Sequence, residues 1–323
     1  MNETDADPPG SPLREAGVGR WGLGTWLFGW ETPVDQAHRL MGLALEHGVT
    51  YFDTANNYGH GQSERIVGQF VKRIRDQVVI GTKVYAPFGP NPADRGLSAD
   101  AVRRATEQSL RRLDTDYIDL LYLHRPDPAV PAKETAEALA GLVRQGKVRA
   151  VGTSTFRGTE LDAMQRALVA AGISPTVCDQ APYSLLERAV EQLTGEALRR
   201  WSIGVVAWSP LAEGLLTGKY RDAGVAGRLT RWSLMEQPRF RAGIERAAVF
   251  QKLADEYRVT LSELALCWPR QRSLVECVLI GARTPEQFDT YLSSDQVELP
   301  AEVDVRVDTI LGPGQTVLHH YAT

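Results

Sequence analysis

Short apolar runs alternate with longer amphipathic stretches along almost the whole chain after Arg20. The apolar runs are rich in β-branched and aromatic residues and end at polar residues or glycine, which is typical of buried strands. We therefore predict strands at Trp21–Gly24, Tyr51–Asp53, Val78–Lys83, Ile118–Leu123, Arg149–Ser154, Val177–Gln180, Gly204–Trp208 and Val275–Ile280.

The amphipathic stretches carry apolar residues at three- and four-residue spacing, which indicates helices with one buried face. They lie at Val34–His47, Ser63–Ile74, Ser98–Leu113, Lys133–Gln145, Thr159–Ala171, Arg188–Trp201, Ile244–Tyr257, Leu261–Arg270 and Pro285–Leu292. Eight strands, each followed by a helix, predict an α/β fold, a closed (β/α)8 TIM barrel. An extra C-terminal helix, Ala301–Leu311, is expected outside the barrel.

The two ends of the chain lack this alternation. Residues 1–12 are acidic and proline-rich, and we expect a disordered tail there. Residues 13–323 are predicted to form a single barrel domain, since barrels of this length are routinely one domain, with an irregular tail from Gly312. Gly17–Gly22 matches G-x-G-x-x-G, but no helix follows it, so we reject a dinucleotide fingerprint there.

Charge and cysteine content narrow the function classes. Lys plus Arg number 36 against 40 for Asp plus Glu, a net charge of −4, which argues against a nucleic-acid partner. No apolar run approaches the length of a bilayer span, so we expect no membrane association and a cytoplasmic protein. Cys178, Cys267 and Cys277 share no metal-ligand spacing and read as reduced core residues. The oligomeric state stays open, and an oligomer is possible.

Four polar residues follow the early strands. Asp53 and Tyr58 come at and just after the second strand, Lys83 ends the third, and His124 follows the fourth. In this fold active sites lie at the carboxyl ends of the strands. A phenol can donate a proton, a nearby ammonium lowers its pKa, a carboxylate keeps the lysine charged, and an imidazole can hold a substrate oxygen. The set predicts carbonyl reduction, with a proton delivered to oxygen as a hydride reaches carbon.

Six segments in this order resemble the aldo-keto reductase family, in the branch of bacterial reductases and voltage-gated potassium channel β subunits. They read FDTANNYG, GTKV, YLHRPDP, GKVRAVGTS, WSPLAEGLLTGKY and LIGARTPEQ, and the resemblance runs from about Gly22 to Leu311. It implies a catalytic tetrad of Tyr58, Lys83, Asp53 and His124, with Tyr58 as general acid. It also implies an N-terminal β-hairpin, shortened here because only Leu13–Arg20 is available for it.

The alternative is a regulatory subunit that senses nicotinamide nucleotides and has only vestigial turnover. Channel β subunits replace the histidine before their RPDP motif, whereas this chain keeps His124. That difference favours an enzyme.

The later strand ends suit a nicotinamide nucleotide. The resemblance implies that Ser154 and Gln180 bind the carboxamide and that Trp208 stacks on the ring, although a strand-end tryptophan can equally be core. The residues predicted to bind the cofactor are Gly24, Thr25, Trp26, Asp53, Ser154, Gln180, Trp208, Ser209, Pro210, Leu211, Gly214, Leu216, Gly218, Lys219, Arg228, Gly281, Arg283, Thr284 and Gln287.

A helix N-terminus with nearby arginines favours a phosphorylated cofactor. Thr284 is placed to N-cap the helix opened by Pro285, and Arg283 and Arg228 would suit a 2′-phosphate. We therefore expect NADPH in preference to NADH, with a solvated Arg283 as the alternative. Two departures from the family pattern are Thr155 and Tyr291, where relatives often have Asn.

Aromatic residues cluster in the loops after the first and third strands. The predicted substrate pocket comprises Trp26, Phe28, Trp30, Tyr58, Tyr85, Phe88 and His124. Such a lining suits a small-molecule carbonyl compound with an apolar body, although Trp30 could equally cover a helix end. The natural substrate is not fixed by these residues.

Overall fold

The structure is a computed structural model that describes residues 11–91, 93–221 and 227–322. Eight parallel strands pair in sequence order, and the last closes on the first. The strands are β1 (Trp21–Gly24), β2 (Tyr51–Asp53), β3 (Val79–Val84), β4 (Ile118–Leu123), β5 (Val148–Ser154), β6 (Cys178–Pro182), β7 (Gly204–Trp208) and β8 (Val275–Ile280). The predicted TIM barrel is confirmed, with strand ends within two residues of those expected.

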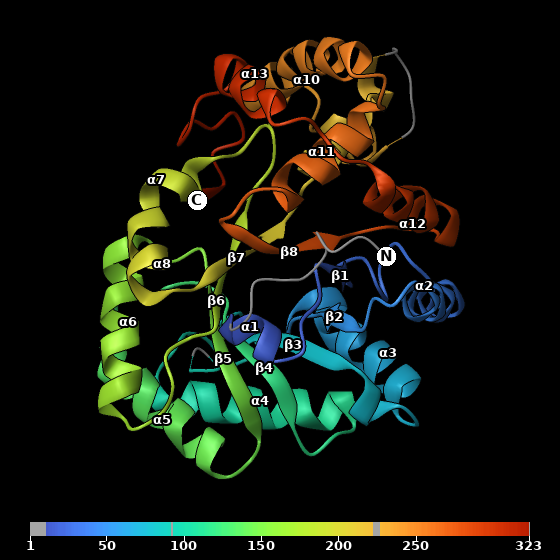
Figure 1. Cartoon of the computed structure of the whole chain (residues 1–323). Helices are drawn as coiled ribbons and strands as arrows, with labels where there is room; N and C mark the ends of the chain where they lie inside the picture. Colours follow the sequence, from blue (N-terminus) through green and yellow to red (C-terminus); the bar gives the residue numbers. More distant parts are fainter. Residues whose placement is uncertain (1–10, 92, 222–226, 323) are drawn as a thin grey trace.

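Helices surround the ring of strands (Figure 1). They are α2 (Val34–Glu46), α3 (Gln62–Val71), α4 (Ala99–Leu113), α5 (Ala132–Arg144), α6 (Gly158–Ala170), α7 (Ala189–Leu193), α8 (Gly195–Trp201), α9 (Arg228–Arg231), α10 (Pro238–Glu256), α11 (Leu261–Arg270), α12 (Pro285–Leu292) and α13 (Glu302–Ile310). Short 3-10 turns lie at Tyr58–Gly61, Arg75–Gln77, Ala212–Thr217, Lys219–Arg221, Ser293–Gln296 and His320–Ala322.

Three helices differ from the prediction by more than one residue. The helix expected at Ser63–Ile74 ends three residues early, at Val71. The helix expected at Arg188–Trp201 breaks at Thr194, whose φ of −130° is not helical and whose hydroxyl donates to the Phe156 carbonyl at 2.8 Å. The helix expected from Ile244 begins earlier, at Pro238, because proline is favoured in the first turn of a helix.

The predicted N-terminal hairpin is wrong. A four-residue helix, α1 (Pro12–Glu15), takes its place, because Pro12 opens a helical turn and Gly17, with φ +84°, ends it. Leu13 is fully buried against the barrel interior. Residues 1–10 of the expected tail lie outside the described residues.

Polar contacts of Ser11 and Arg14 also attach this segment to the amino end of the barrel. The Ser11 hydroxyl donates to the Glu276 carboxylate. The Arg14 guanidinium donates to the Glu276 carbonyl at 2.5 Å and to the Val18 carbonyl at 2.7 Å. The segment therefore closes the amino end of the barrel, opposite the cavity described below.

The barrel interior forms its own core. It contains Leu13, Val18, Tyr51, Leu120, Tyr122, Val177, Cys178, Val206, Cys277 and Leu279. A second, larger core fills the space between strands and helices. Cys178, Cys267 and Cys277 are buried and free, as the sequence predicts.

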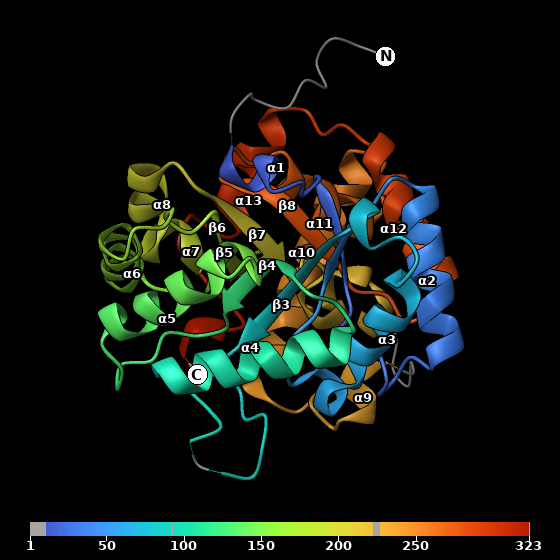
Figure 2. The same cartoon turned by 90° about the horizontal axis from the view of Figure 1, so that it is seen from below.

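The C-terminal segment from Gly312 is largely irregular, as predicted, but it is attached to the rest of the chain. The Val317 amide donates to the Leu186 carbonyl, and the Arg188 amide donates to the Gln315 carbonyl, both at 2.9 Å. Leu318 is buried. These contacts bring His320 to the carboxyl end of the barrel, and Figure 2 shows α1 at the other end.

Two features are absent from the described part of the chain. None of its helices is long and apolar enough to cross a membrane. No group of His, Cys, Asp and Glu within it has an arrangement that could hold a metal ion.

Candidate active site

A cavity of about 640 Å³ opens at the carboxyl ends of the strands. Every strand or the loop that follows it contributes to the lining, including Thr25 after β1, Tyr85 after β3 and Gly281 after β8. Such a place is where this fold builds its active sites.

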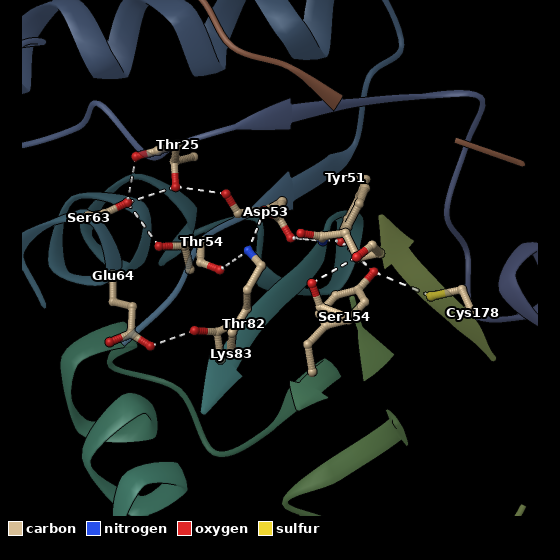
Figure 3. Close-up of polar contacts among 12 residues, drawn as sticks. Thr25, Tyr51, Asp53, Thr54, Ser63, Glu64, Thr82, Lys83, Ser154 and Cys178 are labelled. Atoms are coloured by element: carbon tan, nitrogen blue, oxygen red, sulfur yellow. Dashed lines mark hydrogen bonds and ion pairs between the residues drawn. The ribbon is translucent and has the colours of Figure 1, made fainter. Parts of the chain in front are cut away.

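Asp53 and Lys83 form a buried ion pair at the floor of this cavity (Figure 3). The lysine Nζ lies 2.5 Å from Asp53 Oδ1 and 2.7 Å from the Thr54 carbonyl. The other carboxylate oxygen, Oδ2, accepts from Gln180 Nε2 at 2.7 Å. A lysine has three donors, and with two of them engaged the ammonium also faces the Tyr58 ring, whose centroid lies 4.8 Å from Nζ. The ammonium is therefore fixed in position by two groups and directed at a third.

The ionisation of this pair follows from its surroundings. Burial acts to lower the pKa of Lys83, but the negative charge of Asp53, supported by the interaction with Tyr58, outweighs it and holds that pKa above its ordinary value. The lysine thus stays an ammonium at neutral pH.

Tyr58 lies on the cavity side of this pair. Lys83 Nζ is 4.8 Å from the centroid of the Tyr58 ring. Burial raises the pKa of the Tyr58 phenol, and the ammonium of Lys83 offsets only part of that rise. The lowering influence predicted for Lys83 is therefore present, but the net direction is upward, so Tyr58 is a protonated phenol at neutral pH.

His124 stands beside the phenol. Its ring centroid is 6.1 Å from that of Tyr58, with the planes at 78°. Burial, with the positive charges of Lys83 and Arg125, lowers the pKa of His124 to about 3. The imidazole is therefore neutral at physiological pH and has one N–H to donate.

Polar contacts with α3 support the floor of the site. The Ser63 hydroxyl donates to the Thr25 carbonyl at 3.0 Å and accepts from the Thr54 hydroxyl at 2.9 Å (Figure 3). This fixes the segment whose carbonyl holds Lys83. The fully buried Glu64 accepts from Thr82 at 2.7 Å and pairs with Arg112 at 2.6 Å.

Most residues predicted to bind the cofactor line the cavity. They are Gly24, Thr25, Trp26, Asp53, Ser154, Gln180, Trp208, Ser209, Pro210, Leu211, Gly214, Lys219, Gly281, Arg283 and Gln287. Ser154 and Gln180 are register partners on β5 and β6, and the Ser154 hydroxyl donates to the Gln180 carbonyl at 2.8 Å. Two adjacent polar side chains thus face the cavity beside Trp208.

Three residues predicted to bind the cofactor are not among the described residues that line the cavity. Leu216 is fully buried in the core, where its side chain packs instead of facing the cavity. Gly218, in the left-handed region with φ +76°, ends a 3-10 turn. Thr284 performs the predicted N-cap, accepting from the Gln287 amide at 3.3 Å. The side chain of Arg228 lies outside the described residues.

Positive charge gathers at the cofactor side of the cavity. Lys219, Arg231 and Arg283 all line it, together with two carboxylates, Glu31 and Glu213. Glu31 Oε2 lies 2.5 Å from Arg231 and 3.5 Å from Arg283. Burial, with the charges of Arg283 and Arg231, lowers the pKa of Lys219. Lys219, Arg231 and Arg283 outnumber the carboxylates of Glu31 and Glu213 in this part of the lining, and the excess of positive charge suits phosphate groups.

Four of the seven residues predicted for the substrate pocket line the cavity. Trp26, Tyr58, Tyr85 and His124 line the cavity. Phe28 is fully buried in the outer core instead, because it sits in the turn between β1 and α2.

Two other aromatic residues predicted for the substrate pocket, Trp30 and Phe88, are not among the described residues that line the cavity. Trp30 is 56% exposed and stacks on Trp232 at 5.1 Å between ring centroids. Phe88 packs against the outer core and lies under the guanidinium of Arg104, 5.9 Å from its ring centroid.

Several lining residues were not predicted from the sequence. They include Glu31, Asn57, Arg125, Glu213, Arg231 and His320. His320 meets the Trp208 ring at 5.1 Å between centroids, and its nitrogens lie 3.3 Å from Glu187 and 3.4 Å from Glu213. Burial acts to lower its pKa, but these two carboxylates raise it above its ordinary value.

A closed eight-stranded barrel with Tyr58, Lys83, Asp53 and His124 at its carboxyl end is typical of one class of proteins. Comparison with known proteins shows which family this is. The family model described as the Aldo/keto reductase family matches residues 20–311. The chain therefore belongs to the aldo/keto reductase family, whose members generally use nicotinamide cofactors.

Two relatives illustrate the range of the family. The uncharacterized oxidoreductase YrpG of Bacillus subtilis (strain 168) is 37% identical over 319 residues, covering 94% of this chain and 96% of that protein. A probable voltage-gated potassium channel subunit beta of Arabidopsis thaliana is 31% identical over 303 residues, covering 89% and 90%.

Proposed function

We propose that the protein catalyses NADPH-dependent reduction of an aldehyde or ketone to an alcohol. The observation that carries this proposal is the position of the Tyr58 phenol, between the buried Lys83–Asp53 pair and the cavity, with His124 beside it. One acidic proton and one neutral N–H donor thus face the space where a carbonyl oxygen would lie.

In this proposal Tyr58 is the general acid. It gives its proton to the carbonyl oxygen while Lys83, held by Asp53 and Thr54, stabilises the phenolate that forms. The role of Lys83 is then greatest in the transition state, when negative charge develops on Tyr58.

His124 orients the substrate. A neutral imidazole can donate one hydrogen bond to the carbonyl oxygen without competing with Tyr58 as a proton source. Its low pKa, about 3, supports this division of roles, because the ring stays neutral over the whole physiological range.

The cofactor side of the cavity fits a nicotinamide nucleotide. Ser154 and Gln180 would bind the carboxamide, and Trp208 would cover the ring. When bound there, the cofactor supplies the hydride. Lys219, Arg231 and Arg283 would hold the phosphates, and their excess of positive charge supports NADPH over NADH.

The substrate in this proposal is a small carbonyl compound with an apolar body, placed against Trp26 and Tyr85. We propose a cytoplasmic enzyme with neither nucleic acid nor membrane as partner.

The test is a titration followed by turnover. Purified protein is titrated with NADPH and NADH by fluorescence, and a nitrobenzaldehyde or phenanthrenequinone is then added while the reduced-nicotinamide absorbance is followed. We expect tighter binding of NADPH and a carbonyl-dependent loss of absorbance. No binding of either nucleotide overturns the cofactor assignment.

A regulatory nucleotide sensor is the second candidate, and the likeness to a probable potassium channel subunit beta favours it. Its signature is tight nucleotide binding with vestigial turnover on every carbonyl tried. Fast turnover with any of them excludes it.

A further inference from the structure

Two buried tyrosines lie inside the barrel beneath the Asp53–Lys83 pair. Tyr51 precedes Asp53 by two residues on β2, so both side chains point to the same face of the strand. Tyr122 precedes His124 by two residues in the same way at the end of β4. Both rings are fully buried in the interior core.

The hydroxyl groups form a directed chain that ends on Asp53. The Tyr51 hydroxyl donates to Asp53 Oδ2 at 3.1 Å (Figure 3). It lies 2.9 Å from the Tyr122 hydroxyl, and Cys178 Sγ is 3.5 Å from the Tyr122 hydroxyl. A hydroxyl has one proton. Since the carboxylate must accept from Tyr51, Tyr122 donates to Tyr51, and Cys178 donates to Tyr122. Every proton in the chain points toward the carboxylate, an arrangement in which each bond strengthens the next.

Neighbouring strands make room for these rings with glycine. A Cβ atom at Gly22 on β1 would lie 2.6 Å from the Tyr51 ring, and one at Gly81 on β3 would lie 2.7 Å from its hydroxyl. A Cβ atom at Gly152 on β5 would lie 2.6 Å from the Tyr122 ring. Real Cβ atoms do not approach so closely, so the strands on either side accommodate both phenols.

We propose that Tyr51 is a positioning residue for the reductase reaction: its hydroxyl, held by Tyr122, fixes the Asp53 carboxylate so that Oδ1 faces Lys83. This rests on the proposed function, because its effect is exerted on Tyr58 as general acid. The roles proposed for Asp53, Tyr58, Lys83 and His124 do not by themselves require a tyrosine two residues before the aspartate.

The effect reaches Tyr58 through the charges between them. Loss of the Tyr51 hydroxyl leaves Asp53 with one donor fewer, which makes the carboxylate more basic. A more basic Asp53 draws the ammonium proton of Lys83 toward itself, and less positive charge acts on Tyr58. The Tyr58 phenolate then becomes harder to form.

Tyr51 is suited to this role because it stays protonated. Burial, followed by the charge of Asp53, raises its pKa well above the ordinary value. The titratable and charged groups around the Tyr51–Asp53–Tyr58 line are Lys83, Tyr122, His124, Arg125, Cys178 and Cys277.

The first experiment compares Tyr51→Phe with wild type. Hydrogen bonds to charged groups are among the stronger ones, so we expect kcat for reduction to fall about tenfold while nucleotide affinity stays within about twofold. In the reverse reaction, alcohol oxidation, Tyr58 must lose its proton first. The pH dependence of that rate should therefore move to higher pH in the variant.

Two further variants make the result specific. Tyr122→Phe keeps the Tyr51–Asp53 bond but removes its support, so we expect a smaller change in the same direction. It also serves as the test if Tyr51→Phe does not fold. Cys277→Ala repacks the same interior core, and its pH dependence should match wild type. The proposal is overturned if kcat and its pH dependence are unchanged in Tyr51→Phe. If only Tyr122→Phe folds, the same result in that variant overturns it.

A readout without turnover separates this proposal from the proposed function. Tyrosinate absorbance is measured after a rapid pH jump in wild type and in Tyr58→Phe. The difference between the two proteins reports the ionisation of Tyr58 alone. The same difference measured in the Tyr51→Phe background should appear at higher pH. If wild type reduces no carbonyl, the reductase assignment fails, yet this shift still measures the coupling; an unshifted difference overturns the role of Tyr51 in either case.

Discussion

Lys83 illustrates how a single side chain can set the chemistry of its neighbours. Its ammonium has three donors; Asp53 and the Thr54 carbonyl take one each, and the third is left to face Tyr58. Because the first two partners are fixed by β2 and the segment after it, the third donor has little choice of direction. The geometry, more than the charge alone, links the lysine to the phenol.

Replacement of Tyr58 tests the proton source. Tyr58→Phe removes the hydroxyl but keeps the ring against Lys83, so we expect reduction to fall by about 10² to 10⁴-fold, the usual contribution of a general acid. Nucleotide binding, followed by fluorescence, should be unchanged. Turnover close to that of wild type would sink the assignment.

The four tetrad residues could be predicted from the sequence, because each stands at or just after a strand whose end is marked by a change from apolar to polar residues. Glu31, Arg231 and His320 could not. They reach the cavity through loops and through the returning C-terminus, and no periodic pattern records where such segments end. Their ion pairs, such as Glu31–Arg231 across 200 positions, exist only once the fold brings the loops together.

At the level of elements, the loop that leaves β5 is strained. Thr155 has φ +57°, a region that disfavours β-branched residues. It lies beside Ser154 in the cavity wall. Asparagine tolerates this region better.

Thr155→Asn should therefore stabilise the protein. We expect the free energy of unfolding to rise by about 1 kcal/mol, since residues forced into this region cost about 1–3 kcal/mol. Urea unfolding of the two proteins measures it. Thr155→Val is the matched control: it keeps the β-branch and should show no gain, and a loss of stability in the asparagine variant would contradict the strain argument.

The helix α1 makes a separate contribution. Leu13 is fully buried at the closed end of the barrel, far from the cavity. Leu13→Ala should lower the free energy of unfolding by about 2–5 kcal/mol, as other buried leucines do, without changing nucleotide affinity. Glu15→Ala, at an exposed position of the same helix, is the control and should leave stability nearly unchanged. Equal stability of Leu13→Ala and wild type would show that α1 does not hold the barrel closed.

For the whole molecule, two titrating groups give stability opposite dependences on pH. His124 has its pKa lowered to about 3, so the unfolded chain binds more protons between about pH 3 and its ordinary value, and stability falls as pH is lowered. Burial raises the pKa of Asp179 to about 7, so the folded chain binds more protons above the ordinary value, and stability falls as pH is raised toward 7.

Single substitutions should separate the two contributions. Relative to wild type, the free energy of unfolding of His124→Gln should decrease as pH rises from about 4 to 6, whereas that of Asp179→Asn should increase over the same range. Urea unfolding at several pH values measures both. Parallel curves for all three proteins would mean that neither group has a shifted pKa.

The barrel itself could be predicted because eight repeats of strand and helix leave few other ways to bury both faces of the strands. The departures come where local chemistry overrides the repeat. Pro12 opens a helix where a hairpin was expected, and Thr194 bonds to Phe156 and splits a helix in two. A pattern of apolar spacing predicts neither the helix at Pro12 nor the hydrogen bond of Thr194.

The opposite placement of the two chain ends has a practical meaning for anyone who handles the protein. His320 lines the cavity only three positions before the last residue, Thr323, while Ser11 is attached at the closed end of the barrel. An affinity tag or fusion partner at the carboxyl end therefore joins the described structure beside the cavity. One at the amino end joins it at Ser11, on the closed side of the barrel, and is the better choice for kinetics and ligand screens.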